Sequence, residues 1–116
     1  MAITFNGTDD WDTDSIHDTS TNNSRMTIPS GKNGKWRFDC SVRLDTNTDV
    51  VMYLTDDGGT TRWAWHMHDN TDEVSVSWII DLVATEYMEC WAWQNSGANR
   101  TTDTNYTRFT ATYLGS

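Results

Sequence analysis

Two histidines, His66 and His68, stand two residues apart in a segment that alternates like a β-strand. Side chains at such positions project to the same side of a strand, about 7 Å apart. Two imidazoles placed in this way could hold one metal ion if an aspartate, or a histidine of another copy, supplied a third ligand. Exposed histidines that bind nothing are the simpler interpretation. We therefore expect no resident metal and keep His66 and His68 as weak candidates.

Two acidic loops, DDGG at residues 56–59 and DNTD at residues 69–72, carry the oxygen atoms that calcium prefers. Neither has the regularly spaced acidic positions of a calcium-binding loop, so we interpret both as ordinary turns and expect no cofactor. The chain has no Gly-x-Ser-x-Gly nucleophile motif and no phosphate-binding glycine loop. Glu86 and Glu89 could be interpreted as the two carboxylates of a glycosidase. With seventeen acidic residues in the chain, however, such pairs are expected by chance. We do not expect an enzyme.

Cys40 and Cys90 are the only cysteines, and their spacing is not that of a metal site. We expect two buried free thiols, because free cysteine is among the most frequently buried residue types. A bridge between facing strands is the alternative.

The elements that position these residues are predicted to be β-strands. Apolar and polar residues alternate without a break over residues 35–44, and the alternation returns at 62–68 and 74–82. A further strand is expected at 106–114, while residues 12–24 show no period and are expected to form a long loop. Turn-forming residues separate the strands at 30–34, 45–49, 56–59, 69–72 and 95–99. The predicted core is Trp36, Phe38, Cys40, Val42, Trp63, Trp65, Val76, Trp78, Ile80 and Phe109.

The length of 116 residues suits one domain, spanning residues 1–116. No helical pattern of ten residues or more is present, and seven Trp residues supply the apolar area that a folded chain needs. We expect an all-β fold, a sandwich of roughly eight to ten antiparallel strands. Some strands are apolar on both sides, at 50–54 and 87–93, although a two-layer sandwich buries only one side of each sheet. A second cover, from another copy or from a ligand, is therefore expected.

Three stretches resemble the jelly-roll superfamily of tumour necrosis factor and the complement globular heads, above all its short versions in phage structural proteins. They are SRMTIPSG at 24–31 followed by GKWRF at 34–38, IDLVATEYMEC at 80–90 with QNSG at 94–97, and TRFTATYL at 107–114. Thr85 and Glu86 stand where that family usually has Gly-Asp. The resemblance implies a jelly-roll sandwich that forms a homotrimer. Its threefold contacts would come from outward apolar residues, for which the candidates are Tyr87, Trp91, Trp93 and Tyr113. The alternative is that these four residues cover the core beneath the loop at residues 12–24.

The resemblance also implies a role on a virion surface, as a capsid decoration or head-fibre protein that contacts other virion proteins such as the major capsid protein. Eight basic residues against seventeen acidic ones, a net charge of -9, leave no basic cluster for nucleic acid. An acidic, solvated exterior is expected. No signal peptide or membrane-spanning stretch is encoded, so we expect no membrane partner.

The rival interpretation is a carbohydrate-binding jelly roll for adhesion to a host surface. Exposed tryptophans stack on sugar rings, and Trp63, Trp65, Trp91 and Trp93 are available for this.

Overall fold

The structure is a computed structural model, and it describes residues 24–98 and 106–116. Every regular element within these ranges is a β-strand, and the five strands form one antiparallel sheet. They are β1 (Arg25–Thr27), β2 (Gly34–Thr55), β3 (Trp63–Leu82), β4 (Tyr87–Gln94) and β5 (Arg108–Gly115). The expected all-β, antiparallel class is confirmed. The predicted loop at residues 12–24 lies outside the described residues except for Ser24.

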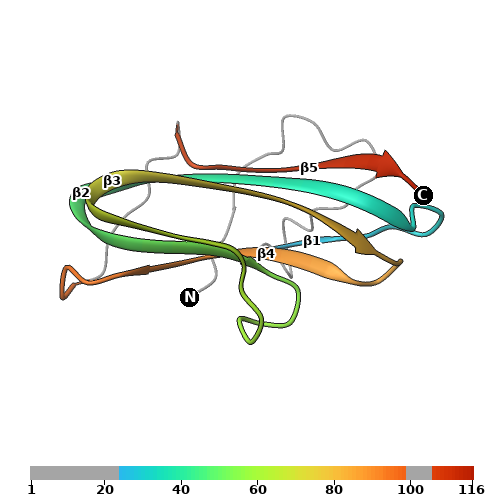
Figure 1. Ribbon diagram of the computed structural model, residues 1–116, viewed down its shortest axis with the longest axis horizontal. Coiled ribbons are helices and arrows are strands. Elements are labelled where there is room, and N and C mark those ends of the chain that lie inside the picture. Colours follow the sequence, from blue (N-terminus) through green and yellow to red (C-terminus); the bar gives the residue numbers. More distant parts are fainter. Residues whose placement is uncertain (1–23, 99–105) are drawn as a thin grey trace.

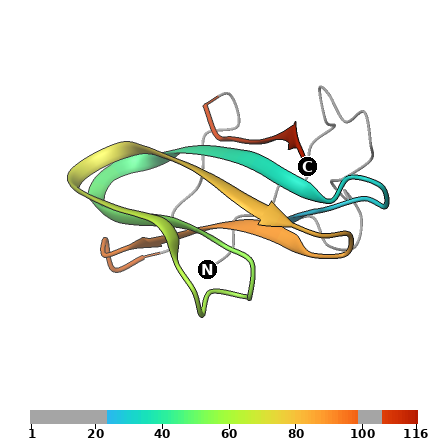
Figure 2. The same cartoon turned by 45° about the vertical axis from the view of Figure 1, so that its right-hand side comes forward.

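The fold is dominated by one long hairpin that bends back over itself. β2 and β3 pair along almost their whole length, from Gly34 with Leu82 to Leu54 with Trp63. Figures 1 and 2 show both strands turning together at one end, so that the hairpin contributes to two facing layers. The upper layer contains β5 with residues 34–43 of β2 and 73–82 of β3. The lower layer contains β1 and β4 with residues 48–55 of β2 and 63–71 of β3.

The prediction that the chain reverses direction at residues 45–49 and 69–72 is wrong. Both segments lie inside β2 and β3, at the bend, where the register shifts between Arg43 and Thr48 and again before Val50. Asn70 takes a positive φ of 49° there, and its amide donates to the carboxylate of Asp49 at 3.0 Å. Polar, turn-forming residues therefore bend the ladder without breaking it. β2 and β3 are therefore each one strand where the turn signals predicted two. The described residues hold five strands, and the expected eight to ten are not confirmed.

The core lies between the layers. Trp36, Phe38, Cys40 and Val42 of the upper layer face Val50, Met52 and Leu54 of the lower layer, and all seven side chains are buried. Val76 and Phe109, also expected in the core, are buried, while Trp63 and Ile80 are partly buried and pack against it. The alternation of period two thus placed most of the predicted core side chains on the inward side.

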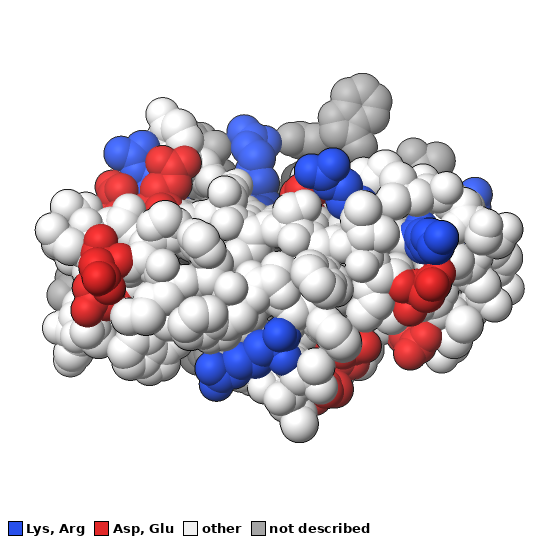
Figure 3. Space-filling model, viewed as in Figure 1, with Lys and Arg blue, Asp and Glu red and all other residues white. Residues whose placement is uncertain are grey.

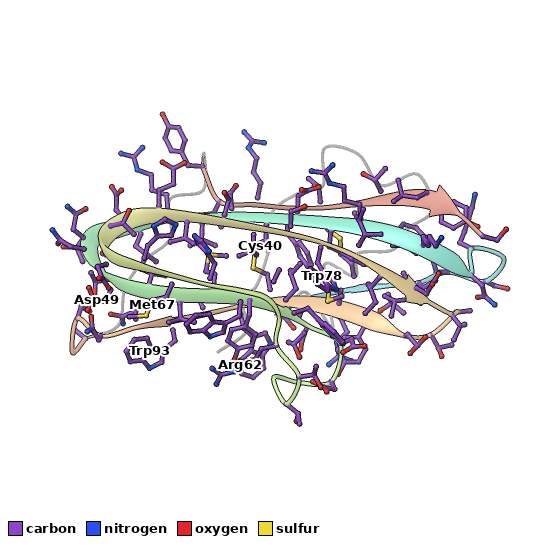
Figure 4. The ribbon with its side chains drawn as sticks, viewed as in Figure 1. Cys40, Asp49, Arg62, Met67, Trp78 and Trp93 are labelled. Atoms are coloured by element: carbon purple, nitrogen blue, oxygen red, sulfur yellow. A yellow bond between two sulfur atoms is a disulfide. The ribbon has the colours of Figure 1, made fainter. Side chains whose placement is uncertain are left out.

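Two predicted core residues, Trp65 and Trp78, are exposed. Trp78 pairs with the buried Phe38 and so has the inward orientation, but β3 is an edge strand among the described residues, and the ring stays 39% exposed. The ring stacks on Trp63 with centroids 5.8 Å apart (Figure 4 labels Trp78). Trp65 has the wrong orientation, because the ladder slips between Leu54 and Met52 and Ala64 takes a φ of 54°. One extra residue in a strand sends the following side chains to the other face.

Cys40 and Cys90 form a disulfide, so the expectation of two free thiols is wrong. Cys40 lies on β2 in the upper layer and Cys90 on β4 in the lower layer, and both are buried. Both point between the layers, because their register partners Phe109 and Leu54 are core residues. Burial of two cysteines is compatible both with free thiols and with a disulfide. Only the facing of the two layers brings the sulfur atoms together.

The turn between β3 and β4 holds Thr85 in the left-handed region, with a φ of 78°. Its amide donates to the carbonyl of Ile28 at 3.0 Å, and the Glu86 amide closes the turn on the Val83 carbonyl at 3.1 Å. The conformation is therefore held from two sides, although a β-branched residue adopts it at a cost. The resemblance places a glycine at this position.

We expect Thr85→Gly to raise the free energy of unfolding by about 0.5–1 kcal/mol, because relief of the left-handed strain exceeds the added entropy of the unfolded chain. Chemical denaturation measures the change. Ala84→Gly, one residue earlier and without a positive φ, should instead lower stability by about 0.5–1 kcal/mol. Equal effects of the two substitutions would contradict the argument.

Candidate functional site

The outer side of the lower layer carries a group of apolar side chains that we call the aromatic face. It consists of Val51, Tyr53, Trp65, Met67, Trp91 and Trp93. Val51 pairs with Met67 on one flank and with Trp93 on the other, so these three side chains stand in a row across three strands. Tyr53 pairs with Trp91 in the next row. Trp65 lies two residues before Met67 on β3 and so projects from the same side of the sheet.

The middle of the aromatic face is already packed. Val51 and Tyr53, on the central strand of the three, are buried although they point away from the core. The rings of Tyr53 and Trp91 lie 6.1 Å apart, and the guanidinium of Arg62 sits over the Tyr53 ring at 4.7 Å. The hairpin turn also supports this region, since a Cβ on Gly59 would lie 3.0 Å from the Trp91 ring. These contacts make a packed floor beneath the exposed side chains.

The outer parts of the aromatic face are open to solvent. Trp65, Met67 and Trp93 are exposed to 49%, 46% and 52%. Figure 4 shows Met67 and Trp93 projecting from the lower layer on its outer side, together with Arg62. In the space-filling view of Figure 3, uncharged atoms cover most of the visible surface, and the acidic and basic groups are interspersed. Three large apolar side chains, each about half exposed around a buried floor, are unusual for a surface that contacts only water.

The outer side of the upper layer has a different character. Arg37 donates to the carboxylate of Asp39 at 3.2 Å on β2, and Arg43 pairs with Asp72 at 3.5 Å. The exposed apolar residues there, Ile79 and Leu114, stand among these polar groups. This side has the composition of an ordinary solvated sheet, so we assign no site to it.

Of the four predicted contact residues, three lie on the outer side of the lower layer. Trp91 and Trp93 belong to the aromatic face, and Tyr87 lies further along β4 with the Arg25 guanidinium 3.9 Å from its ring centroid. The fourth, Tyr113, is on the other layer and points inward. Its ring packs on Trp36 at 5.1 Å, and its hydroxyl donates to the Asn33 carbonyl at 3.0 Å. The expectation that Tyr113 faces away from the interior is wrong, because it pairs with the inward Trp36.

Four members of the aromatic face were not among the predicted contact residues of the trimer, although Trp65 was one of the tryptophans considered for sugar stacking. The apolar run at residues 50–54 signals that Val51 and Tyr53 need an outer cover. Trp65 was assigned to the core instead, and Met67 follows from the same shift of register at Ala64. A bulge of one residue leaves no trace in the alternation, so the sequence could not assign these two side chains to an outer surface.

The acidic groups considered for chemistry serve local structure. The Asp57 carboxylate accepts hydrogen bonds from the Thr61 amide at 2.8 Å and from the Thr55 hydroxyl at 2.9 Å. The hydrogen bonds from Thr61 hold the pKa of Asp57 below its ordinary value. These bonds fix the turn between β2 and β3. No cluster of three potential metal-binding side chains occurs in residues 24–98 and 106–116.

The paired glutamates are also engaged. Glu86 accepts from the Val83 amide at 2.7 Å in the turn before β4. Glu89 is buried on the outer side of β4, where it accepts from the Ser24 hydroxyl at 2.7 Å and from the Trp91 indole at 3.3 Å. Its carboxylate therefore anchors β1 and one ring of the aromatic face. Both roles are structural.

His66 and His68 lie side by side at the open edge of the lower layer, on the side of β3 opposite to the aromatic face.

No helix in the described part of the chain is long and apolar enough to span a membrane. A scan of protein-family models and a search of curated proteins find no match to the chain. The identification of the aromatic face as a candidate site therefore depends on its geometry alone.

Proposed function

We propose that this chain is a non-enzymatic structural module of a virus particle, a homotrimeric jelly-roll sandwich that decorates the particle surface. One observation carries the proposal: the aromatic face presents Trp65, Met67 and Trp93 about half exposed around the buried Val51 and Tyr53. The partner that we assign to this face is a second copy of the chain. The resemblance of the strand-end motifs to the jelly-roll superfamily supports the trimer and the particle.

The composition of the aromatic face supports burial against protein. Interface centres are enriched in Trp, Tyr and Met and depleted of carboxylates, while charged groups stand at the rim. The aromatic face has three tryptophans, a tyrosine and a methionine, and Arg62 lies over the Tyr53 ring. Residues that are large, rigid and packed from below are those that contribute most when an interface excludes water. A homotrimer would cover this face in every copy at once.

The buried disulfide supports a location outside a reducing compartment. Disulfides form and persist at virion and cell surfaces and in secreted proteins, and they are rare where thiols are kept reduced. The net charge of -9 suits a solvent-exposed position and disfavours direct contact with a nucleic acid. In this proposal the remaining surface contacts other virion proteins, such as the major capsid protein.

We expect the wild-type protein to have three times the mass of one chain by multi-angle light scattering, and Trp93→Asp to reduce it to the mass of one chain. A carboxylate placed in an apolar interface loses hydration that the interface cannot replace. Trp93 is preferred to Trp91 because Trp91 packs on Tyr53 and near Gly59, so its loss would also disturb the fold. Circular dichroism of both proteins verifies that the strands remain.

Ile79→Asp is the matched control. Ile79 is exposed to 54%, close to the value for Trp93, but it lies on the upper layer among polar groups. Its substitution should leave the mass of the assembly unchanged. A wild-type protein that stays a single chain at high concentration would refute self-association through the aromatic face.

A carbohydrate ligand is the second candidate for the same face. Trp65 and Trp93 are exposed on the same side of the lower layer, and their rings are available to stack on sugar rings. In that case the wild-type protein is a single chain, and polysaccharides quench its tryptophan fluorescence. Trp93→Asp would abolish the quenching without changing the mass.

A further inference from the structure

His66 and His68 approach each other closely at the open edge of the fold. Their register partners on β2, Met52 and Val50, are core residues, but β3 is an edge strand and both imidazoles are exposed. The ring centroids are 4.4 Å apart with an interplanar angle of 65°, and the two Nε2 atoms are 2.7 Å apart. Side chains two apart on a strand start about 7 Å from each other. The two rings therefore lean together and direct the same nitrogen of each ring at one point.

Converging Nε2 atoms have two chemical interpretations. If one ring carries its proton on Nε2, that N–H donates to the lone pair of the other ring. If both rings carry the proton on Nδ1, both lone pairs point at one position, which a cation can occupy. A zinc ion bound by imidazole at 2.0–2.1 Å separates two donors by about 2.9–3.4 Å at coordination angles of about 90–110°. The observed separation is a few tenths of an ångström shorter, which a small rotation of either exposed ring removes.

We propose that His66 and His68 chelate one divalent ion of the late first-row metals, Cu²⁺, Ni²⁺ or Zn²⁺, through their Nε2 atoms. Neutral imidazole suits these ions, and affinity rises toward Cu²⁺ in the series. No third carboxylate, thiol or imidazole of the described residues joins the pair to make a group of three. Water completes the coordination of the ion in a single chain, and the site binds metal reversibly from solution without holding it as part of the fold. The site is separate from the aromatic face and independent of the function proposed for it.

Isothermal titration of the untagged protein with NiCl₂ and with ZnCl₂ tests the site. We expect saturable binding of one ion per histidine pair, reversed by EDTA. His66→Gln and His68→Gln should each weaken the affinity at least about tenfold, since loss of even an outer hydrogen-bond partner of a ligand costs that much. Both side chains are exposed, so neither substitution should change the circular dichroism spectrum.

His17→Gln provides the matched control, because His17 is the one histidine of the chain outside the pair. This variant should bind Ni²⁺ as the wild type does. The proposal fails if the wild type shows no saturable binding of either ion. It also fails if the affinities of His66→Gln and His68→Gln equal that of the wild type, since carboxylates elsewhere would then account for the binding.

Discussion

Removal of the Cys40–Cys90 disulfide is expected to lower the free energy of unfolding by about 4 kcal/mol. The bridge closes a loop of 50 residues, and the chain-entropy model gives about 4 kcal/mol for that length at 25 °C. The bridge also joins the only two layers of the described fold, so its loss acts on the packing of the entire core. For a domain whose total stability is about 5–15 kcal/mol, this is a large fraction.

The measurement is chemical denaturation of a Cys40→Ala/Cys90→Ala double variant, compared with the wild type in the presence and absence of dithiothreitol. The reductant should destabilise the wild type and leave the double variant unchanged, which separates loss of the bridge from loss of the sulfur atoms. Thiol titration of the wild type in denaturant without reductant should detect no free thiol. Two free thiols per chain in that assay would show that the bridge does not form.

The second large effect is expected at Phe38, where substitution by alanine should cost about 3–5 kcal/mol. Phe38 is fully buried, and its ring contacts those of Trp36 and Phe109, with centroids 6.4 Å and 6.1 Å away. Neighbours on two strands, β2 and β5, therefore lose contacts together. The cavity would lie between the layers, where the disulfide restricts the collapse that could fill it.

Tyr106→Ala is the matched control for the loss of a ring. Tyr106 is exposed to 51%, and its main described ring contact is the Arg43 guanidinium at 4.7 Å. An exposed contact of that kind contributes about 0.5–1 kcal/mol. Denaturation curves should therefore separate the two variants clearly. Similar decreases in the free energy of unfolding for the Phe38 and Tyr106 variants would mean that the core does not lie around Phe38.

The sequence predicted local features of this fold well and long-range features poorly. Alternation over residues 35–44 placed Trp36, Phe38 and Cys40 on one side of a strand, and all three are buried. The hairpin around residues 56–59 is also present, because its turn residues act locally. The turn signals at 45–49 and 69–72 were misread, since the same residue types that reverse a chain also bend a paired ladder.

The candidate site was likewise predicted in part from the sequence and decided in part by the tertiary structure. The apolar run at 50–54 indicated an apolar outer side, so the existence of an apolar outer face was predictable, and Trp91 and Trp93 were correctly placed on an outer side. The shift of register at Ala64 decided that Trp65 and Met67 join them. Tyr113 was excluded from this surface by its pairing with Trp36.

By itself, then, the sequence determined the strand character, the inward side of most strands and the surplus of apolar rings, because these depend on the identity and spacing of neighbouring residues. The tertiary structure alone decided that the two cysteines form a bridge, that His66 and His68 converge at an edge, and that Trp65, Met67 and Trp93 lie together on the outer side of the lower layer. These three outcomes depend on which strands pair and where the ladder slips. Pairing is a competition among distant segments, and a single extra residue reverses the side on which every later side chain lies.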